Sequence, residues 1–251
     1  MFEIFPKPFL LGHRGAKKYA PENTLAAFRL ALAQGAHGVE LDAKLSADGH
    51  VVVHHDASVN RTTNGQGPVA RLTLEQLRRL DAGSFFSEGF RGERIPTLEE
   101  VFAEIGTRAF INVELTNYST PRDSLVETTC ELVSRFKLQD RILFSSFFAS
   151  NLRKAAAILP AAPRGLLALD GWKGAWARSF GFNFGDYAAL HPYLTDVTAQ
   201  QVKRVQRVGR RIIVWTANRE TDIRRLLDWG VDGIITDDPA LAARVFSGSA
   251  A

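Results

Sequence analysis

Residues 109–145 read AFINVELTNYSTPRDSLVETTCELVSRFKLQDRILFS, and they contain the pattern on which the predicted fold depends. Two short apolar runs, 109–114 and 141–145, flank a helix-patterned stretch over 124–136. The order strand, helix, strand predicts two parallel strands joined by a crossover helix.

The same alternation extends in both directions from this unit. Expected strands are 9–11, 38–42, 51–54, 109–114, 141–145, 164–168, 188–192, 211–216 and 233–236. Expected helices are 24–33, 97–105, 124–136, 149–159, 199–208, 220–229 and 239–245. Asn23 is expected to cap the first helix, and Thr97 with Glu100 forms a capping box for the second.

About eight strand–helix units in 251 residues predict an α/β chain folded as a (β/α)8 TIM barrel. A doubly wound open sheet is the alternative. It would place a G-x-G-x-x-G turn after an early strand, and the sequence has none. We therefore predict one barrel domain over residues 1–251.

Residues 44–96 interrupt the alternation with turn-forming pairs such as Asp48-Gly49 and Asn64-Gly65. We interpret them as a small insertion after the second strand, packed over one end of the barrel. Phe85, Phe86 and Phe90 are expected to bury this insertion against the barrel. The alternative is that they form an apolar rim for an acyl chain.

The composition excludes several classes of protein. A hydrophobic fraction of 45% and a charged fraction of 23% exclude a disordered chain, and the single Cys130 excludes an internal disulfide. The net charge of +4 is spread along the sequence, which permits a small anionic substrate and gives no support for nucleic-acid binding. No signal-peptide pattern and no long apolar run is present, so we expect a cytoplasmic protein without a membrane anchor.

Carboxylates recur at the ends of the second and third parallel strands. Glu40 and Asp42 are two residues apart, as are Asn112 and Glu114, so each pair lies on one face of its strand. The carboxyl ends of barrel strands form the active-site face. Three carboxylates inside the barrel would repel one another unless a hard divalent cation, Mg²⁺ or Ca²⁺, or a basic side chain compensates. We favour the metal, with Glu40, Asp42 and Glu114 as its ligands.

Histidines occur near two strand ends. His13 is followed by Arg14, which can hold a phosphate bidentately, and by Gly15, which is expected to let the backbone approach a ligand. His54 and His55 follow the run 51–53, and only one of two adjacent strand residues can face the site. The remaining histidines are interpreted as ordinary packing or surface residues: His37, His50 and His191.

These motifs, taken together and in order, resemble those of the glycerophosphodiester phosphodiesterase family over about residues 10–240. They are Gly12-His13-Arg14-Gly15, Pro21-Glu22-Asn23-Thr24, Glu40-Leu-Asp42, His54-His55-Asp56, Arg61-Thr62-Thr63, Ile95-Pro96-Thr97, Asn112-Val113-Glu114, Ser145-Ser146-Phe147, Val214-Trp215-Thr216 and Thr236-Asp237-Asp-Pro239. The resemblance implies a metal held by Glu40, Asp42 and Glu114. It also implies that His13 and His55 are the acid–base pair.

The chain departs from the family pattern at one position. The family usually has a lysine two residues after the third-strand glutamate, and this chain has Thr116 there. Arg14 and the metal then remain as positive partners of the phosphate, and Lys44 is a candidate substitute for the missing lysine. Trp215 is a candidate for lining the alcohol pocket, or else it packs the barrel.

The predicted function is metal-dependent hydrolysis of glycerophosphodiesters to glycerol 3-phosphate and an alcohol. A lysophospholipid-type phosphodiesterase is the alternative within the same chemistry. A non-catalytic phosphate- or metal-binding relative would have lost a member of the constellation, and a metal-dependent barrel isomerase would not need two histidines.

Overall fold

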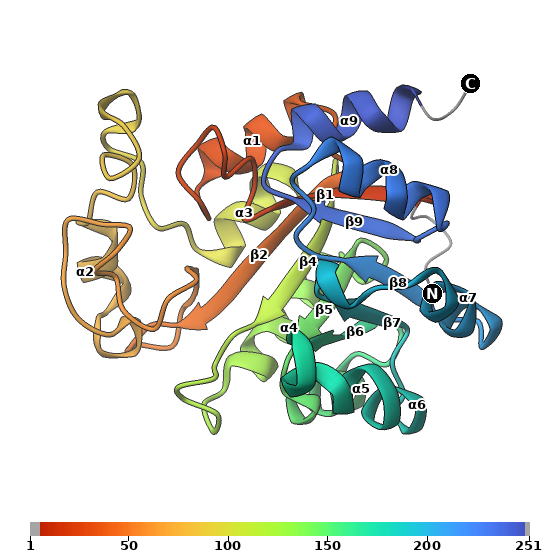
Figure 1. Ribbon diagram of the computed structural model, residues 1–251. Helices are drawn as coiled ribbons and strands as arrows, with labels where there is room; N and C mark the ends of the chain where they lie inside the picture. Colours follow the sequence, from red (N-terminus) through yellow and green to blue (C-terminus); the bar gives the residue numbers. More distant parts are fainter. Residues whose placement is uncertain (1–5, 249–251) are drawn as a thin grey trace.

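A computed structural model describes residues 6–248 (Figure 1). Eight parallel strands form a closed barrel, because the first strand pairs with both the second and the last. The strands are β1 (Phe9–His13), β2 (Gly38–Leu45), β4 (Phe110–Leu115), β5 (Ile142–Ser146), β6 (Arg164–Ala168), β7 (Ala189–Pro192), β8 (Arg211–Val214) and β9 (Gly233–Thr236). The (β/α)8 prediction is confirmed, and the open-sheet alternative is wrong.

Seven helices lie where the sequence predicts them. They are α1 (Leu25–Ala33), α3 (Leu98–Ile105), α4 (Leu125–Arg135), α5 (Ala149–Ile158), α7 (Ala199–Arg207), α8 (Glu220–Asp228) and α9 (Pro239–Gly248). The capping box of Thr97 and Glu100 is present. The expected cap at Asn23 is wrong: Thr24 caps α1 by accepting a hydrogen bond from the Ala27 backbone N–H.

Between β2 and α3 the chain leaves the barrel, to the left in Figure 1. The short strand β3 (Val51–Val53) pairs antiparallel with β2, and η1 (Val69–Arg71), α2 (Leu74–Arg78) and η2 (Glu88–Phe90) follow. This segment has its own apolar cluster, which includes Val52, Val59 and Leu77. Phe85 and Phe86 stay about 40% exposed, so the expectation that they bury the segment against the barrel is wrong.

Besides the short helices between β2 and α3, the helical segment after β6 was not predicted. After β6 the chain forms η3 (Gly171–Gly174), the π-helical turn η4 (Ala177–Gly181) and α6 (Phe182–Phe184). The outward face of this segment carries aromatic rather than polar residues, so its sequence lacks the amphipathic pattern of a surface helix. It occupies the crossover position between β6 and β7.

The barrel interior is apolar at one end and polar at the other. Phe9, Leu11, Leu143, Ile213 and Ile235 form a buried cluster separate from the larger core between strands and helices. The buried carboxylates Glu40 and Asp42 lie toward the carboxyl ends of the strands, where the next section places the site. Among residues 6–248, no helix is long and apolar enough to span a bilayer.

Candidate active site

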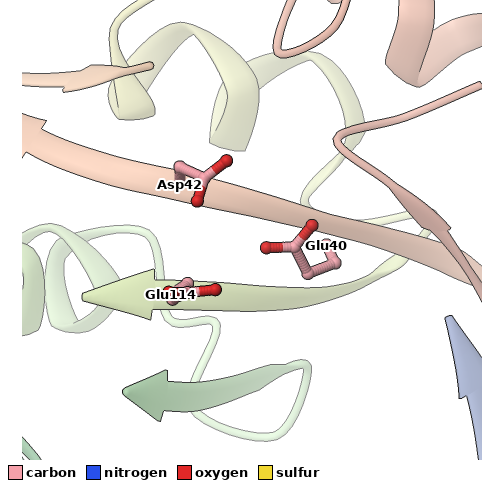
Figure 2. A group of neighbouring side chains, drawn as sticks. All are labelled: Glu40, Asp42 and Glu114. Atoms are coloured by element: carbon pink, nitrogen blue, oxygen red, sulfur yellow. The ribbon is translucent and has the colours of Figure 1, made fainter. Parts of the chain in front are cut away.

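Strand register brings the three predicted carboxylates together. In the β2–β4 ladder, Asp42 lies opposite Glu114, and Glu40 lies opposite Asn112. Residues opposite each other in a sheet share a face, so these side chains all point into the barrel. One oxygen from each of Glu40, Asp42 and Glu114 lies within 4.8 Å of the others, and Figure 2 shows the three carboxylates directed toward one another.

The electrostatics of this cluster fit a bound cation. Burial and the adjacent Asp42 carboxylate raise the pKa of Glu114 to about 8. Burial and the nearby Asp42 and Glu114 carboxylates raise the pKa of Glu40 well above its usual range. Beside them, Asn112 Oδ1 is buried without a hydrogen-bond partner among the described residues. A hard divalent cation would compensate the repulsion, and it prefers oxygen ligands of this kind.

Arg14 contacts the carboxylate cluster directly. Its Nη1 donates to Glu22 Oε1 at 2.8 Å, its Nε lies 3.3 Å from Asp42 Oδ2, and its backbone N–H donates to Glu40 Oε2. Burial alone would raise the pKa of Asp42, but the Arg14 guanidinium brings it below its usual range. Arg14 thus holds Asp42 ionised next to the place where a phosphate would bind.

The backbone after Arg14 turns toward a helix. Gly15 has φ of +87°, and a Cβ there would lie 2.6 Å from the backbone of Ala27 in α1. The glycine is therefore required for contact with α1. The expectation that the backbone at Gly15 approaches a ligand stays a prediction.

His13 points its Nε2 toward the cluster. Its Nδ1 lies 2.6 Å from Asp237 Oδ1, and its Nε2 lies 3.9 Å from Glu40 Oε2. Burial lowers the pKa of His13, so the neutral ring is favoured. Because an ionised carboxylate only accepts hydrogen bonds, Nδ1 carries the proton and Nε2 is left with a lone pair facing the cluster.

His54 and His55 have different environments. His54 is buried, and its Nε2 donates to the backbone oxygen of Ser58. His55 has 41% of its side chain exposed, and its Nδ1 donates to Asp56 Oδ1 at 2.6 Å. Arg61 in turn donates to Asp56 and Glu22, which connects this loop to Arg14. Of the two histidines, His55 is the one with an unengaged Nε2.

Lys44 contacts Thr116, the residue at which the family usually has a lysine. It follows Glu40 and Asp42 on the same face of β2, and its ammonium donates to the Thr116 hydroxyl at 3.0 Å and to the Thr116 carbonyl at 2.8 Å. Burial lowers its pKa, and the carboxylates of Asp42 and Glu114 oppose that effect. A lysine from β2 thus places its charge beside the residue where the family usually has its lysine.

Aromatic rings form the wall of the site on the side of β4, β5, β7 and β8. Trp215 packs edge-on against Phe147 and Tyr193, with ring centroids 5.8 and 5.1 Å apart. Its indole N–H donates to the His191 carbonyl, and it also contacts the interior apolar cluster. Trp215 therefore packs the barrel just after the end of β8, and its role in lining an alcohol pocket stays a prediction.

Three contacts of the site were missed by sequence reasoning. Asp237 orients His13, Asn23 donates to Asp42 Oδ2 at 2.8 Å, and Tyr118 donates to Glu114 Oε1 at 2.8 Å. Asp237 follows directly on the strand end at Thr236, so the rule that strand ends face the site would have found it. Asn23 and Tyr118 lie in loops, so the rule for strand ends does not predict that their side chains face the site.

Comparison with known proteins gives the same family as the one that the sequence motifs resemble. The model of the glycerophosphoryl diester phosphodiesterase family matches residues 13–241. The chain belongs to this family. It is 40% identical over 234 residues to a glycerophosphodiester phosphodiesterase of Caldanaerobacter subterraneus, covering 93% of this chain and 95% of that protein.

Solved structures of glycerophosphodiester phosphodiesterases and related enzymes superimpose closely. The phosphodiesterase of Oleispira antarctica, solved in complex with sn-glycerol-3-phosphate, has a TM-score of 0.88 and 32% identity, with 96% of this chain and 97% of that chain covered. A glycerophosphoryl diester phosphodiesterase from Silicibacter pomeroyi has a TM-score of 0.83 and 26% identity, and the match covers 97% of this chain and 95% of that chain. The chain is accordingly a phosphoric diester hydrolase of the glycerophosphodiester phosphodiesterase family, and this family is associated with divalent metals.

Proposed function

We propose that this enzyme hydrolyses small glycerophosphodiesters to glycerol 3-phosphate and an alcohol, using a divalent cation and the pair His13 and His55. One observation carries the proposal. Each of these histidines has its Nδ1 bound to a carboxylate, Asp237 or Asp56. His13 Nε2 then faces Glu40 at 3.9 Å, and His55 is near enough to the cluster for its charge to lower the pKa of Asp42. The product complex of the Oleispira relative supports glycerol 3-phosphate as the product.

The histidines supply the proton transfers. One Nε2 takes the proton from the attacking oxygen, which belongs to water or to the neighbouring glycerol hydroxyl. In the second case a cyclic phosphate forms, and water then opens it to glycerol 3-phosphate. The other Nε2 gives a proton to the alcohol oxygen as its bond to phosphorus breaks. Imidazole suits both tasks because its unperturbed pKa is near neutrality. Asp237 and Asp56 fix the ring orientations and tautomers.

Positive charge at the site stabilises the phosphate. Glu40, Asp42 and Glu114 would hold Mg²⁺ or Ca²⁺, which supplies Lewis-acid stabilisation of the nonbridging oxygens. Arg14 is placed beside Asp42 to bind the same group, and Lys44, on the same face of β2 as Asp42, brings its ammonium to Thr116. Trp215 and its aromatic neighbours line the side on which the alcohol leaves.

The direct test is release of glycerol 3-phosphate from a panel of glycerophosphodiesters with different alcohols, in the presence and absence of Mg²⁺ or Ca²⁺. Metal-dependent release from several of them is the expected result. Lysophospholipids in the same panel test the alternative substrate class. Binding of glycerol 3-phosphate without turnover of any diester would instead favour a non-catalytic relative.

Lys44→Ala is expected to lower kcat/KM for glycerophosphodiesters by roughly 10- to 100-fold, the effect of losing one charge-assisted hydrogen bond to the phosphate. Adding Thr116→Lys to that variant should restore part of the loss, because the charge returns to the same place. The two changes should be non-additive, since both act on one phosphate. Steady-state kinetics of the two single variants and the double variant measure this.

Lys44→Met is the control for packing, because it keeps the length of the buried side chain without its charge. It should match Lys44→Ala in kcat/KM and exceed it in thermal stability. If Lys44→Met retains full kcat/KM, Lys44 is not a phosphate partner, and Arg14 with the metal must supply that charge.

A further inference from the structure

An exposed aromatic stripe runs along the helical segment between β6 and β7. Trp172, Trp176, Phe180 and Phe184 follow one another at four-residue spacing, and their exposed fractions are 84%, 56%, 61% and 77%. The rings of Phe180 and Phe184 lie 4.3 Å apart, Trp176 lines the same groove as both, and Trp172 lies one four-residue step before Trp176 in η3. Most large apolar side chains in a monomeric protein are covered, so a contiguous row of four marks a binding surface.

The stripe continues into an apolar groove. Trp176, Phe180 and Phe184 face Ala149, Leu152 and Ala156 of α5 across a groove of about 470 Å³. Figure 1 shows α5 and α6 side by side on the outside of the barrel.

The stripe also begins beside the active-site face. Trp172 lies in η3, a few residues after β6 ends, and Asp196, which follows β7, accepts hydrogen bonds from the Gly171 backbone and from Arg178. The loops after β6 and β7 both belong to the face that holds the site.

Basic side chains of the segment 199–211 lie next to the aromatic stripe. The sequence 199–211 contains five Lys or Arg residues and no Asp or Glu. Arg204 donates to the Arg178 carbonyl, which fixes α7 against the aromatic segment. Lys203 and Arg207 are exposed, and no carboxylate among residues 6–248 lies within ion-pair distance of either. The nearby Asp186 and Asp196 are already paired with Arg164 and Arg178.

We propose that this face docks on the surface of an anionic lipid bilayer, with the four rings entering the headgroup region and Lys203 and Arg207 contacting lipid phosphates. Exposed Trp and Phe beside Lys and Arg are the side chains that bind such interfaces. A second copy of the chain fits less well, because a two-fold contact through the stripe would bring the basic α7 flanks together. Docking by this face places the active-site rim close to the membrane.

The test measures binding of the full-length protein to vesicles of phosphatidylcholine alone and of equal parts phosphatidylcholine and phosphatidylglycerol, by flotation. Binding to the anionic vesicles, with a blue shift of tryptophan emission, is expected. The triple variant W172S/F180S/F184S should bind at least about tenfold more weakly. The variant Lys203→Gln with Arg207→Gln should lose roughly 25-fold on anionic vesicles, about fivefold per charge, and salt should have the same effect.

The variant F85S/F86S is the matched control, since it removes two exposed rings from the segment between β2 and α3. It should bind vesicles as the parent does. All variants should keep their kcat/KM for a soluble glycerophosphodiester, which shows that they are folded and that the effect is confined to docking.

Two results would overturn the proposal. One is the absence of binding to anionic vesicles, or binding by the triple variant equal to that of the parent. The other is a dimer in sedimentation that the triple variant abolishes, which would make a second copy the occupant. Because binding is measured without substrate, either result leaves the proposed hydrolysis untouched.

Discussion

Replacing His13 or His55 with alanine is expected to lower kcat for glycerophosphodiester hydrolysis by roughly 10²–10⁴-fold in each case, the contribution of a general acid or base. His13 Nε2 faces Glu40, and the Nδ1 of each histidine is bound to a carboxylate, so neither ring has a substitute among its described contacts. Release of glycerol 3-phosphate at saturating substrate and metal measures the effect.

His54→Ala is the control, because His54 is adjacent to His55 and its Nε2 is bound to the Ser58 backbone. Losing the His54 side chain should destabilise the loop that contains Ser58. The variant should therefore show a lower midpoint of thermal unfolding and a smaller change in kcat. If His54→Ala remains folded and loses as much kcat as His55→Ala, the assignment of His55 is wrong. A small effect of His13→Ala would remove His13 from the reaction.

Removing divalent metal with a chelator is expected to abolish hydrolysis, and adding Mg²⁺ or Ca²⁺ should restore it. Glu114→Gln should weaken metal affinity by at least roughly 100-fold, because a neutral amide replaces one of three anionic ligands of nearly the same size. Titration calorimetry measures the affinity, and metal-induced stabilisation against heat gives an independent readout.

Glu75→Gln is the matched control for this substitution, since Glu75 is an exposed glutamate of α2 paired only with Arg79 among residues 6–248. It should leave metal affinity and activity unchanged. Full activity of the chelated enzyme would contradict the metal assignment, as would equal metal affinity of Glu114→Gln and the parent.

The sequence was sufficient for the barrel and for the acidic cluster. Apolar runs alternating with helix patterns specify parallel strands and crossover helices, and the two-residue periodicity of a strand places Glu40 with Asp42 and Asn112 with Glu114 on common faces. Two helical segments were missed: α2, although Thr73 and Gln76 form a capping box there, and a segment after β6 that lacks amphipathic periodicity. This second segment, 171–184, lacks that periodicity because its aromatic residues point outward.

Loop contacts could not be predicted because no periodicity governs them. Asn23 has the residue type of a helix cap, yet its amide binds Asp42 and the adjacent Thr24 forms the cap. Gly15 has the residue type of a ligand loop, yet α1 occupies the space beside it. In both cases the neighbour that decides the role is brought by tertiary packing.

The sequence by itself therefore determined the fold class, the faces of the strands and the residue types of the site. Only the tertiary structure decided the partners, because barrel closure pairs β1 with β9 and brings Asp237 to His13 across 224 residues of sequence. The parallel pairing of β2 with β4 brings Lys44 to Thr116, just beyond β4. Local patterns fix which way a side chain points, whereas long-range pairing fixes what it meets.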